Sequence, residues 1–197
     1  PASWLVCILL IPILQSLYLY FAWLAFYPLD NYMKRRVMKR AQTLREQFPD
    51  LTVIGITGSV GKTTTKELLA HILSDKNPLV TPAHVNTEMG VSMWLTSKLT
   101  AYSSQLTTSQ DQLSKNQQPM IAVIEMGAYR QGEIKLLCNI VQPTIGIITF
   151  IGKQHIALFG SQEKLCKAKG ELFGALPKDG LAILNGDSPL CDDLKEL

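Results

Sequence analysis

The sequence predicts an α/β fold with a mostly parallel β-sheet, preceded by a transmembrane helix. Three observations lead to this prediction. No charged residue precedes Asp30. From Leu51 onward, short β-rich runs alternate with helical patterns, as in parallel α/β sheets. A glycine-bearing turn joins the first of these runs to a helical pattern. We therefore divide the chain into a transmembrane helix (1–29), a basic juxtamembrane linker (30–50) and an α/β domain (51–197).

The first segment has the length and composition of a membrane span. Trp4 to Phe26 is about 23 residues without a charge, or about 34 Å of helix against a hydrocarbon core of about 30 Å. Neither a basic region before it nor a small-residue cleavage site after it indicates a signal peptide. A buried core helix is rarely apolar on every face. Five basic residues follow the span, which predicts that the rest of the chain lies on the cytoplasmic side: Lys34, Arg35, Arg36, Lys39 and Arg40.

The linker that follows is basic with intermittent apolar residues. This pattern fits a juxtamembrane helix on anionic lipid, and equally a solvated connecting helix. Pro49-Asp50 is expected to end it.

The domain is built from alternating elements. Apolar or β-rich runs predict strands, and periodic patterns between them predict helices. One stretch, Ala101–Gln118, is rich in Ser, Thr and Gln and predicts a surface excursion. The strands are expected at Thr52–Thr57, Leu79–Thr81, Met120–Glu125, Thr144–Ile151 and Leu181–Leu184, and the helices after the glycine turn (through Leu68, Leu69, Ile72 and Leu73), at Gly132–Val141 and at Gln162–Leu176.

Composition excludes some functional classes. A formal net charge of +3 on 197 residues gives no support for nucleic-acid binding. The four cysteines are scattered without a CxxC pair, so a zinc site or a disulfide framework is not expected and the thiols are predicted to be reduced.

The clearest motif runs from Gly58 to Thr63, between a predicted strand and a predicted helix. Its glycines let backbone N–H groups converge on phosphate oxygens, assisted by the helix N-terminus. Lys62 can reach the terminal phosphates, and the Thr63 hydroxyl can ligate Mg²⁺. Ile56 stands where the general pattern has its first glycine, so this is a shortened GxxGK[ST] loop. The absence of an NKxD-type string argues against a GTPase.

Two further residues follow predicted strands. Glu125 ends a buried strand, where open α/β sheets place ligand groups, and a carboxylate there suits Mg²⁺, although a strand-end salt bridge is the alternative. His155 follows the next strand region. Taken alone, such a histidine is more often structural than a ligand.

Several strings, in order, resemble the Mur ligase family: VIGITGSVGKTTTKELL, TPAHVNTEMGVSMWL, AVIEMGAYRQGEI, TFIGKQHIALFGSQEKLCKAKGELF and AILNGDSP. Together they extend from about Thr52 to Pro189. The EMGA-x-x-x-GEI and AKGE strings favour the family member that adds D-alanyl-D-alanine to UDP-N-acetylmuramoyl-tripeptide.

The resemblance implies roles for individual residues. It assigns the ATP phosphate loop to Gly58, Ser59, Gly61, Lys62, Thr63 and Thr64, and a segment close to the nucleotide to Asn185 and Asp187. It implies metal ligation by Thr63, Glu125, His155 and Lys169, with Lys62, Lys169 and His155 as the catalytic set. Lys169 matches a lysine that family members carry as a carbamate. Asn86 and Thr87 match the substrate and phosphate cleft.

The resemblance also implies an activity. It is ATP- and Mg²⁺-dependent amide formation in peptidoglycan precursor synthesis, in which a muropeptide carboxylate forms an acyl phosphate and an amine displaces phosphate. Related ligases of the folylpolyglutamate or cyanophycin type, and a non-catalytic membrane-anchored nucleotide-binding module, are the alternatives. Intact Lys62, Thr63, Glu125, His155 and Lys169 argue against the last.

The chain departs from the family pattern at both ends. The family places a UDP-substrate domain before the ATPase domain, where this chain has the apolar helix and basic linker. We therefore expect a bacterial protein of the cytoplasmic membrane, with its catalytic domain on the cytoplasmic side and a UDP- or lipid-linked acceptor. The domain 51–197 is expected to be C-terminally incomplete.

Overall fold

The computed structural model describes residues 2–108, 121–152, 156–187 and 194. The chain forms two compact units, Pro1–Val37 and Met38–Leu197. One helix, α1 (Ala2–Glu46), contributes to both and contains Pro12 and Pro28. The predicted transmembrane segment and most of the predicted linker are thus one continuous helix. The last part of that linker, from Met38, belongs to the second unit, because Ala41 and Arg45 are buried in it.

In the first unit, α1 is apolar on all sides between Leu10 and Leu29. Its large apolar side chains between Leu10 and Met33 are exposed, and none of its most apolar stretch is buried. By length and composition, it is the one helix among the described residues that could cross a membrane.

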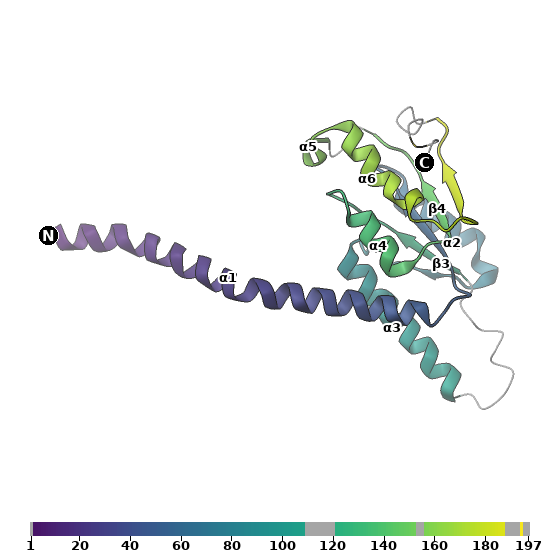
Figure 1. The fold of residues 1–197 in the computed structure, drawn as a ribbon, viewed down its shortest axis with the longest axis horizontal. Helices are drawn as coiled ribbons and strands as arrows, with labels where there is room; N and C mark the ends of the chain where they lie inside the picture. Colours follow the sequence, from purple (N-terminus) through teal and green to yellow (C-terminus); the bar gives the residue numbers. More distant parts are fainter. Residues whose placement is uncertain (1, 109–120, 153–155, 188–193, 195–197) are drawn as a thin grey trace. The chain divides into compact units, whose positions relative to one another are not determined.

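The second unit is built on a five-stranded parallel sheet in the order β2-β3-β1-β4-β5 (Figure 1). The strands are β1 (Thr52–Thr57), β2 (Leu79–Val80), β3 (Ile121–Glu125), β4 (Ile145–Ile148) and β5 (Leu181–Leu184). The predicted α/β fold with a parallel sheet is therefore confirmed. The strand predicted over Thr144–Ile151 is shorter than expected.

Helices cover both faces of this sheet. Helix α2 (Lys62–Ile72), which leads into a short 3₁₀ turn (Ser74–Lys76), packs against one face. Helices α3 (Glu88–Thr108), α4 (Glu133–Val141) and α6 (Gln162–Gly174) build the core on the other, and α5 (Ile156–Phe159) packs beside α6. Strand β1 alternates between these cores: Ile54 and Ile56 face α2, whereas Val53 joins the other cluster. Burial on both faces explains why β1 and β3 read as continuous apolar runs.

Helix α3 shows where the sequence prediction was wrong. The surface excursion expected over Ala101–Gln118 is helical as far as Thr108, and its remainder, 109–118, lies outside the described residues. No element was predicted for the start of this helix. Its buried face, Val91, Leu95 and Leu99, packs into the core and outweighs the weak helix propensity of the Ser and Thr residues that follow.

The sheet topology determines where a site can form. Strand order reverses around β1, and the carboxyl ends of all five strands lie at one edge. Ligands of open α/β sheets bind at such a switch point. The register sets Ile56 beside Glu125, so the end of β3 lies next to the loop that follows β1.

Candidate nucleotide and metal site

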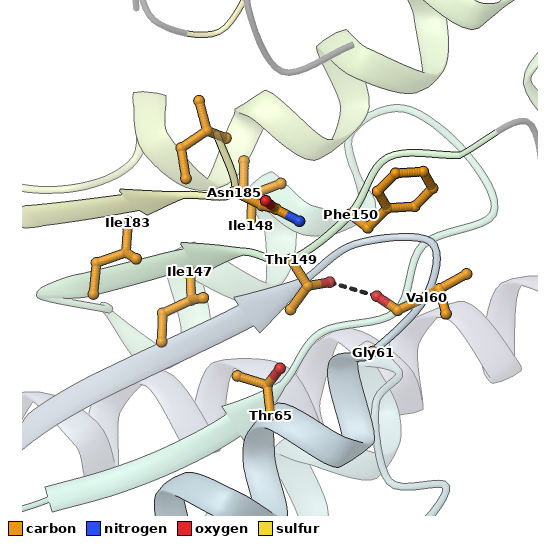
Figure 2. A pocket seen from close by; sticks show the side chains of 10 residues that line it. Val60, Gly61, Thr65, Ile147, Ile148, Thr149, Phe150, Ile183 and Asn185 are labelled. Carbon is orange, nitrogen blue, oxygen red and sulfur yellow. Dashed lines mark hydrogen bonds between the residues drawn. The ribbon is translucent and has the colours of Figure 1, made fainter. Parts of the chain in front are cut away.

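The phosphate loop lies between β1 and α2 and is held by the chain after β4. Ser59 N donates to Phe150 O at 2.7 Å, and the Thr149 hydroxyl donates to Val60 O at 2.7 Å (Figure 2). Gly58 and Gly61 have φ of +148° and +85°, conformations that favour glycine. A Cβ on Gly58 would lie 2.1 Å from Thr149 Oγ1, so this turn needs glycine for space as well.

This loop leaves donors available for an anion. Gly61 caps α2 without a side-chain hydrogen bond, so backbone N–H groups of the first helical turn are not capped by a side chain. The Ser59 hydroxyl is buried with no hydrogen-bond partner among the described residues. The predicted residues Gly58, Ser59, Gly61, Lys62, Thr63 and Thr64 therefore form one turn and helix start suited to phosphate.

Lys62 folds back over this turn. Its Nζ donates to Gly58 O at 2.9 Å and, more weakly, to Ser59 O at 3.4 Å. Burial lowers the pKa of Lys62, and the nearby Glu125 carboxylate partly opposes that change. A phosphate bound in the loop would take the place of these two carbonyls as the hydrogen-bond acceptor of the Lys62 ammonium.

Glu125 is the centre of the polar cluster at this edge. The residue is 3% exposed. Thr63 Oγ1 donates to its Oε2 at 2.9 Å, and Asn86 Nδ2 donates to its Oε1 at 3.3 Å. The structure thus brings three predicted residues together from the loop, from β3 and from the segment after β2.

A third side-chain partner of Glu125 was not predicted. Lys66, on α2, is 2% exposed, and its Nζ lies 3.4 Å from Glu125 Oε2. The string KTTTKE shows this lysine, but nothing in local spacing distinguishes a buried lysine from one on the exposed face of α2.

Lys169, on α6, is the other lysine that is buried among the described residues, at 4% exposure. Its pKa falls from the ordinary 10.5 to about 8. Burial is the main cause, and the Lys62 cation adds to it, while Glu133 and Glu171 act in the opposite direction. Lys169 therefore carries a substantial fraction of neutral, nucleophilic amine near pH 8.

This shift predicts a pH-dependent stability. The unfolded chain holds the Lys169 proton up to about pH 10.4 and the folded chain only up to about pH 8, so the free energy of unfolding rises with pH between those values. Lys169→Met should remove this rise, which is at most roughly 3 kcal/mol. Urea unfolding at several pH values in CO₂-free buffer measures it. The exposed Lys167→Met variant is the control, and an unchanged slope in Lys169→Met would contradict the prediction.

A cavity of about 500 Å³ adjoins the phosphate loop (Figure 2). Its walls come from the loop, from α2 and from the ends of β4 and β5, with Ile147, Ile183 and Leu184 as apolar surface and Thr149 and Asn185 as polar groups. Apolar walls with a few polar groups suit a nucleoside. Except for Gly61 and Asn185, its lining residues were not predicted to form a site, because apolar residues at strand ends resemble ordinary core.

Of the remaining predicted residues that the structure describes, one lines the cavity and the others do not. Asn185 lines the cavity and accepts from Asp187 N at 3.0 Å, whereas Asp187 itself is exposed and does not line it. Thr87 Oγ1 accepts from Gly90 N at 3.3 Å, so this hydroxyl caps the start of α3. His155 lies outside the described residues.

The donor set at Glu125 fits a magnesium ion better than zinc. Among the described residues, no group of three or more His, Cys, Asp or Glu side chains gathers. One carboxylate and the Thr63 hydroxyl, 2.9 Å apart, are the hard oxygens that Mg²⁺ uses together with nucleotide phosphates. Thr63 and Glu125 are therefore the described residues that would hold it.

Comparisons with known proteins agree with this geometry. Residues 56–197 match the Mur ligase middle domain. A UDP-N-acetylmuramoyl-tripeptide–D-alanyl-D-alanine ligase from Synechocystis sp. is 41% identical over 147 residues, which are 74% of this chain and 28% of that protein. This chain therefore spans little more than a quarter of that relative.

Solved structures show the same likeness. MurF from Acinetobacter baumannii superposes with a TM-score of 0.68 at 33% identity, over 83% of this chain and 32% of that one. MurF from Thermotoga maritima, solved with ADP, gives 0.62 at 31% identity, over 80% and 34% of the two chains. The loop and parallel sheet described above, together with the match over residues 56–197, show that this chain belongs to the Mur ligase family.

Proposed function

We propose that this chain is the ATP-binding part of a membrane-held Mur ligase. In this proposal the enzyme joins D-alanyl-D-alanine, or a similar amine, to the carboxylate of a muropeptide precursor. The observation that carries the proposal is the contact between Thr63 Oγ1 and Glu125 Oε2 at 2.9 Å, beside a phosphate loop over which the Lys62 ammonium lies, 2.9 Å from Gly58 O. The likeness to MurF proteins suggests the substrates.

The reaction proposed has two steps. A substrate carboxylate attacks the γ-phosphate of ATP, forming an acyl phosphate and releasing ADP. The amine then attacks the acyl carbon, phosphate leaves, and the amine proton passes to solvent. Lys62 and the backbone N–H groups of the loop would bind the phosphates and offset the charge of the transferring group. A Mg²⁺ ion held by Thr63 and Glu125 would supply further charge neutralisation when bound.

Lys169 fits the carbamate role that the family resemblance implies. Its neutral amine can attack CO₂, forming an N–C bond and releasing one proton, and the product is an anionic oxygen ligand. The lowered pKa supports this step, because the protonated amine is not a nucleophile.

Helix α1 would hold the enzyme at the bacterial cytoplasmic membrane. Its length, its exposed apolar side chains and the basic residues that follow its apolar stretch support an anchor with the ATP site on the cytoplasmic side. Carbonate extraction of membranes tests this part: the protein should stay in the pellet, and a variant lacking residues 1–29 should be released. Release of the unaltered protein would contradict the anchor.

A ligation assay tests the activity. The complete gene product is incubated with ATP, Mg²⁺, D-alanyl-D-alanine and either a UDP-linked or a lipid-linked muropeptide, and ADP release and the coupled product are measured. We expect ATP-dependent coupling, and use of the lipid-linked acceptor would explain a membrane-held enzyme. Exclusive use of the UDP form would exclude the lipid-linked acceptor, and ATP binding without coupling to either acceptor would contradict the ligase assignment.

A further inference from the structure

We propose that Lys66 is a positioning residue that balances the Glu125 carboxylate while the metal site is empty, so that the divalent cation enters together with nucleotide. This inference rests on the proposed function, because it concerns the same ATP site. It assigns a role to a residue that belongs to no part of the phosphate-loop motif.

Lys66 lies one helical turn beyond Lys62 but serves a different group. Its ammonium lies 3.4 Å from Glu125 Oε2 and 3.5 Å from Pro82 O, whereas the Lys62 ammonium contacts the carbonyls of Gly58 and Ser59. With 2% exposure, Lys66 has its charge enclosed by protein. Lys62 therefore faces the phosphate loop, whereas Lys66 faces the Glu125 carboxylate.

Both oxygens of the carboxylate have partners in this arrangement. Oε2 receives the Thr63 hydroxyl and the Lys66 ammonium, and Oε1 receives the Asn86 amide. Glu125 N donates to Thr81 Oγ1 at 3.1 Å, which holds the end of β3 as well. Lys66 and Asn86 therefore orient Glu125 toward Thr63 before any metal is present.

Charge explains why the lysine is needed. A buried carboxylate without a partner is costly, so the empty site requires a cation. A divalent ion entering alone would meet the positive charges of Lys66 and Lys62 beside the Glu125 carboxylate. Nucleotide phosphates supply the missing negative charge, so binding of metal and nucleotide should reinforce one another.

The same contacts have another interpretation, in which Lys66 only ties α2 to the segment after β2. The two interpretations predict opposite changes in metal affinity when Lys66 is removed. Losing a structural tie loosens Glu125 and weakens metal binding, whereas losing a balancing charge strengthens the binding of metal to the nucleotide-free protein.

The experiment measures Mn²⁺ binding by electron paramagnetic resonance, with and without ADP, for the unaltered chain and for Lys66→Met. Methionine keeps most of the apolar stem and removes the charge. We expect Lys66→Met to bind Mn²⁺ without nucleotide about tenfold or more tightly, and the strengthening that ADP gives to shrink accordingly. Lys76→Met, which removes an exposed lysine beyond the end of α2, should leave both values unchanged. Folded Lys66→Met with unchanged or weaker Mn²⁺ binding would overturn the proposal.

Two further measurements keep the test decisive. If Lys66→Met does not fold, the unaltered chain and Lys66→Arg decide: both should bind Mn²⁺ weakly without ADP and strongly with it, and tight binding without ADP in either would reject the proposal. Failure of the unaltered chain to bind ADP with Mn²⁺ would instead count against the proposed function itself. Normal ADP binding with no effect at Lys66 would count against this inference alone.

Discussion

Lys62→Ala is expected to lower ATP-dependent ligation by the complete gene product about 10²–10³-fold, the cost of removing one preorganised group from a developing charge. Lys62 is the cation of the phosphate loop, and its Nζ lies 2.9 Å from Gly58 O, at the position where phosphate oxygens would compete for it. Removing it leaves the backbone N–H groups to bind the nucleotide without a nearby charge. Binding of ADP to the chain should weaken as well.

The control for this prediction is Lys98→Ala. Lys98 is exposed on α3, so its loss removes the same charge away from the loop. Ligation rates and ADP titrations of both variants give the comparison. If Lys62→Ala keeps the ligation rate and ADP affinity of the unaltered protein, the loop is not the nucleotide site.

Arg45→Ala is expected to give the largest loss of stability, about 3 kcal/mol or more in the free energy of unfolding. Arg45 is 3% exposed near the end of α1. Its guanidinium donates to Val141 O and Leu51 O, each at 2.9 Å, and also contacts the carbonyls of Phe48 and Gln142. Alanine would leave several of these buried carbonyls without a donor.

The test compares urea unfolding of Arg45→Ala with that of Arg40→Ala, an exposed arginine on the same helix. Arg40→Ala should stay within about 0.5 kcal/mol of the unaltered chain. Arg45→Lys should recover little stability, because an ammonium cannot reproduce the planar fork that serves separate carbonyls. Equal stability of Arg45→Ala and Arg40→Ala would show that these carbonyls find other partners, such as water.

The burial of Arg45 and its hydrogen bonds to backbone carbonyls could not be predicted from its surroundings in the sequence. It lies in a segment rich in Lys and Arg, which predicts solvent or lipid contact. Its partner Val141 is 96 positions away. In the folded protein the Arg45 guanidinium, unlike that of Arg40, lies at the carboxyl end of α4, where helix carbonyls lack partners within the helix.

Local patterns determined a good part of this protein. Apolar runs predicted the strands, because a strand buried on both faces needs apolar residues at every position. The glycines, Lys62 and Thr63 predicted the phosphate loop, because a tight turn before a helix needs these residue types at adjacent positions. The charge-free opening predicted a helix that is apolar on all sides. Each of these signals depends on neighbours in the chain.

Tertiary structure alone decided which polar and charged side chains come into contact. Thr63 and Glu125 are 62 positions apart, and Lys66 reaches the same carboxylate only because β1 and β3 are adjacent in the sheet. Burial of Lys66 and Lys169, the cavity between the loop and β5, and the extension of α3 to Thr108 likewise depend on packing. Strand order and long-range burial are properties of the whole fold, and they set the electrostatics of a site whose residue types the sequence had already indicated.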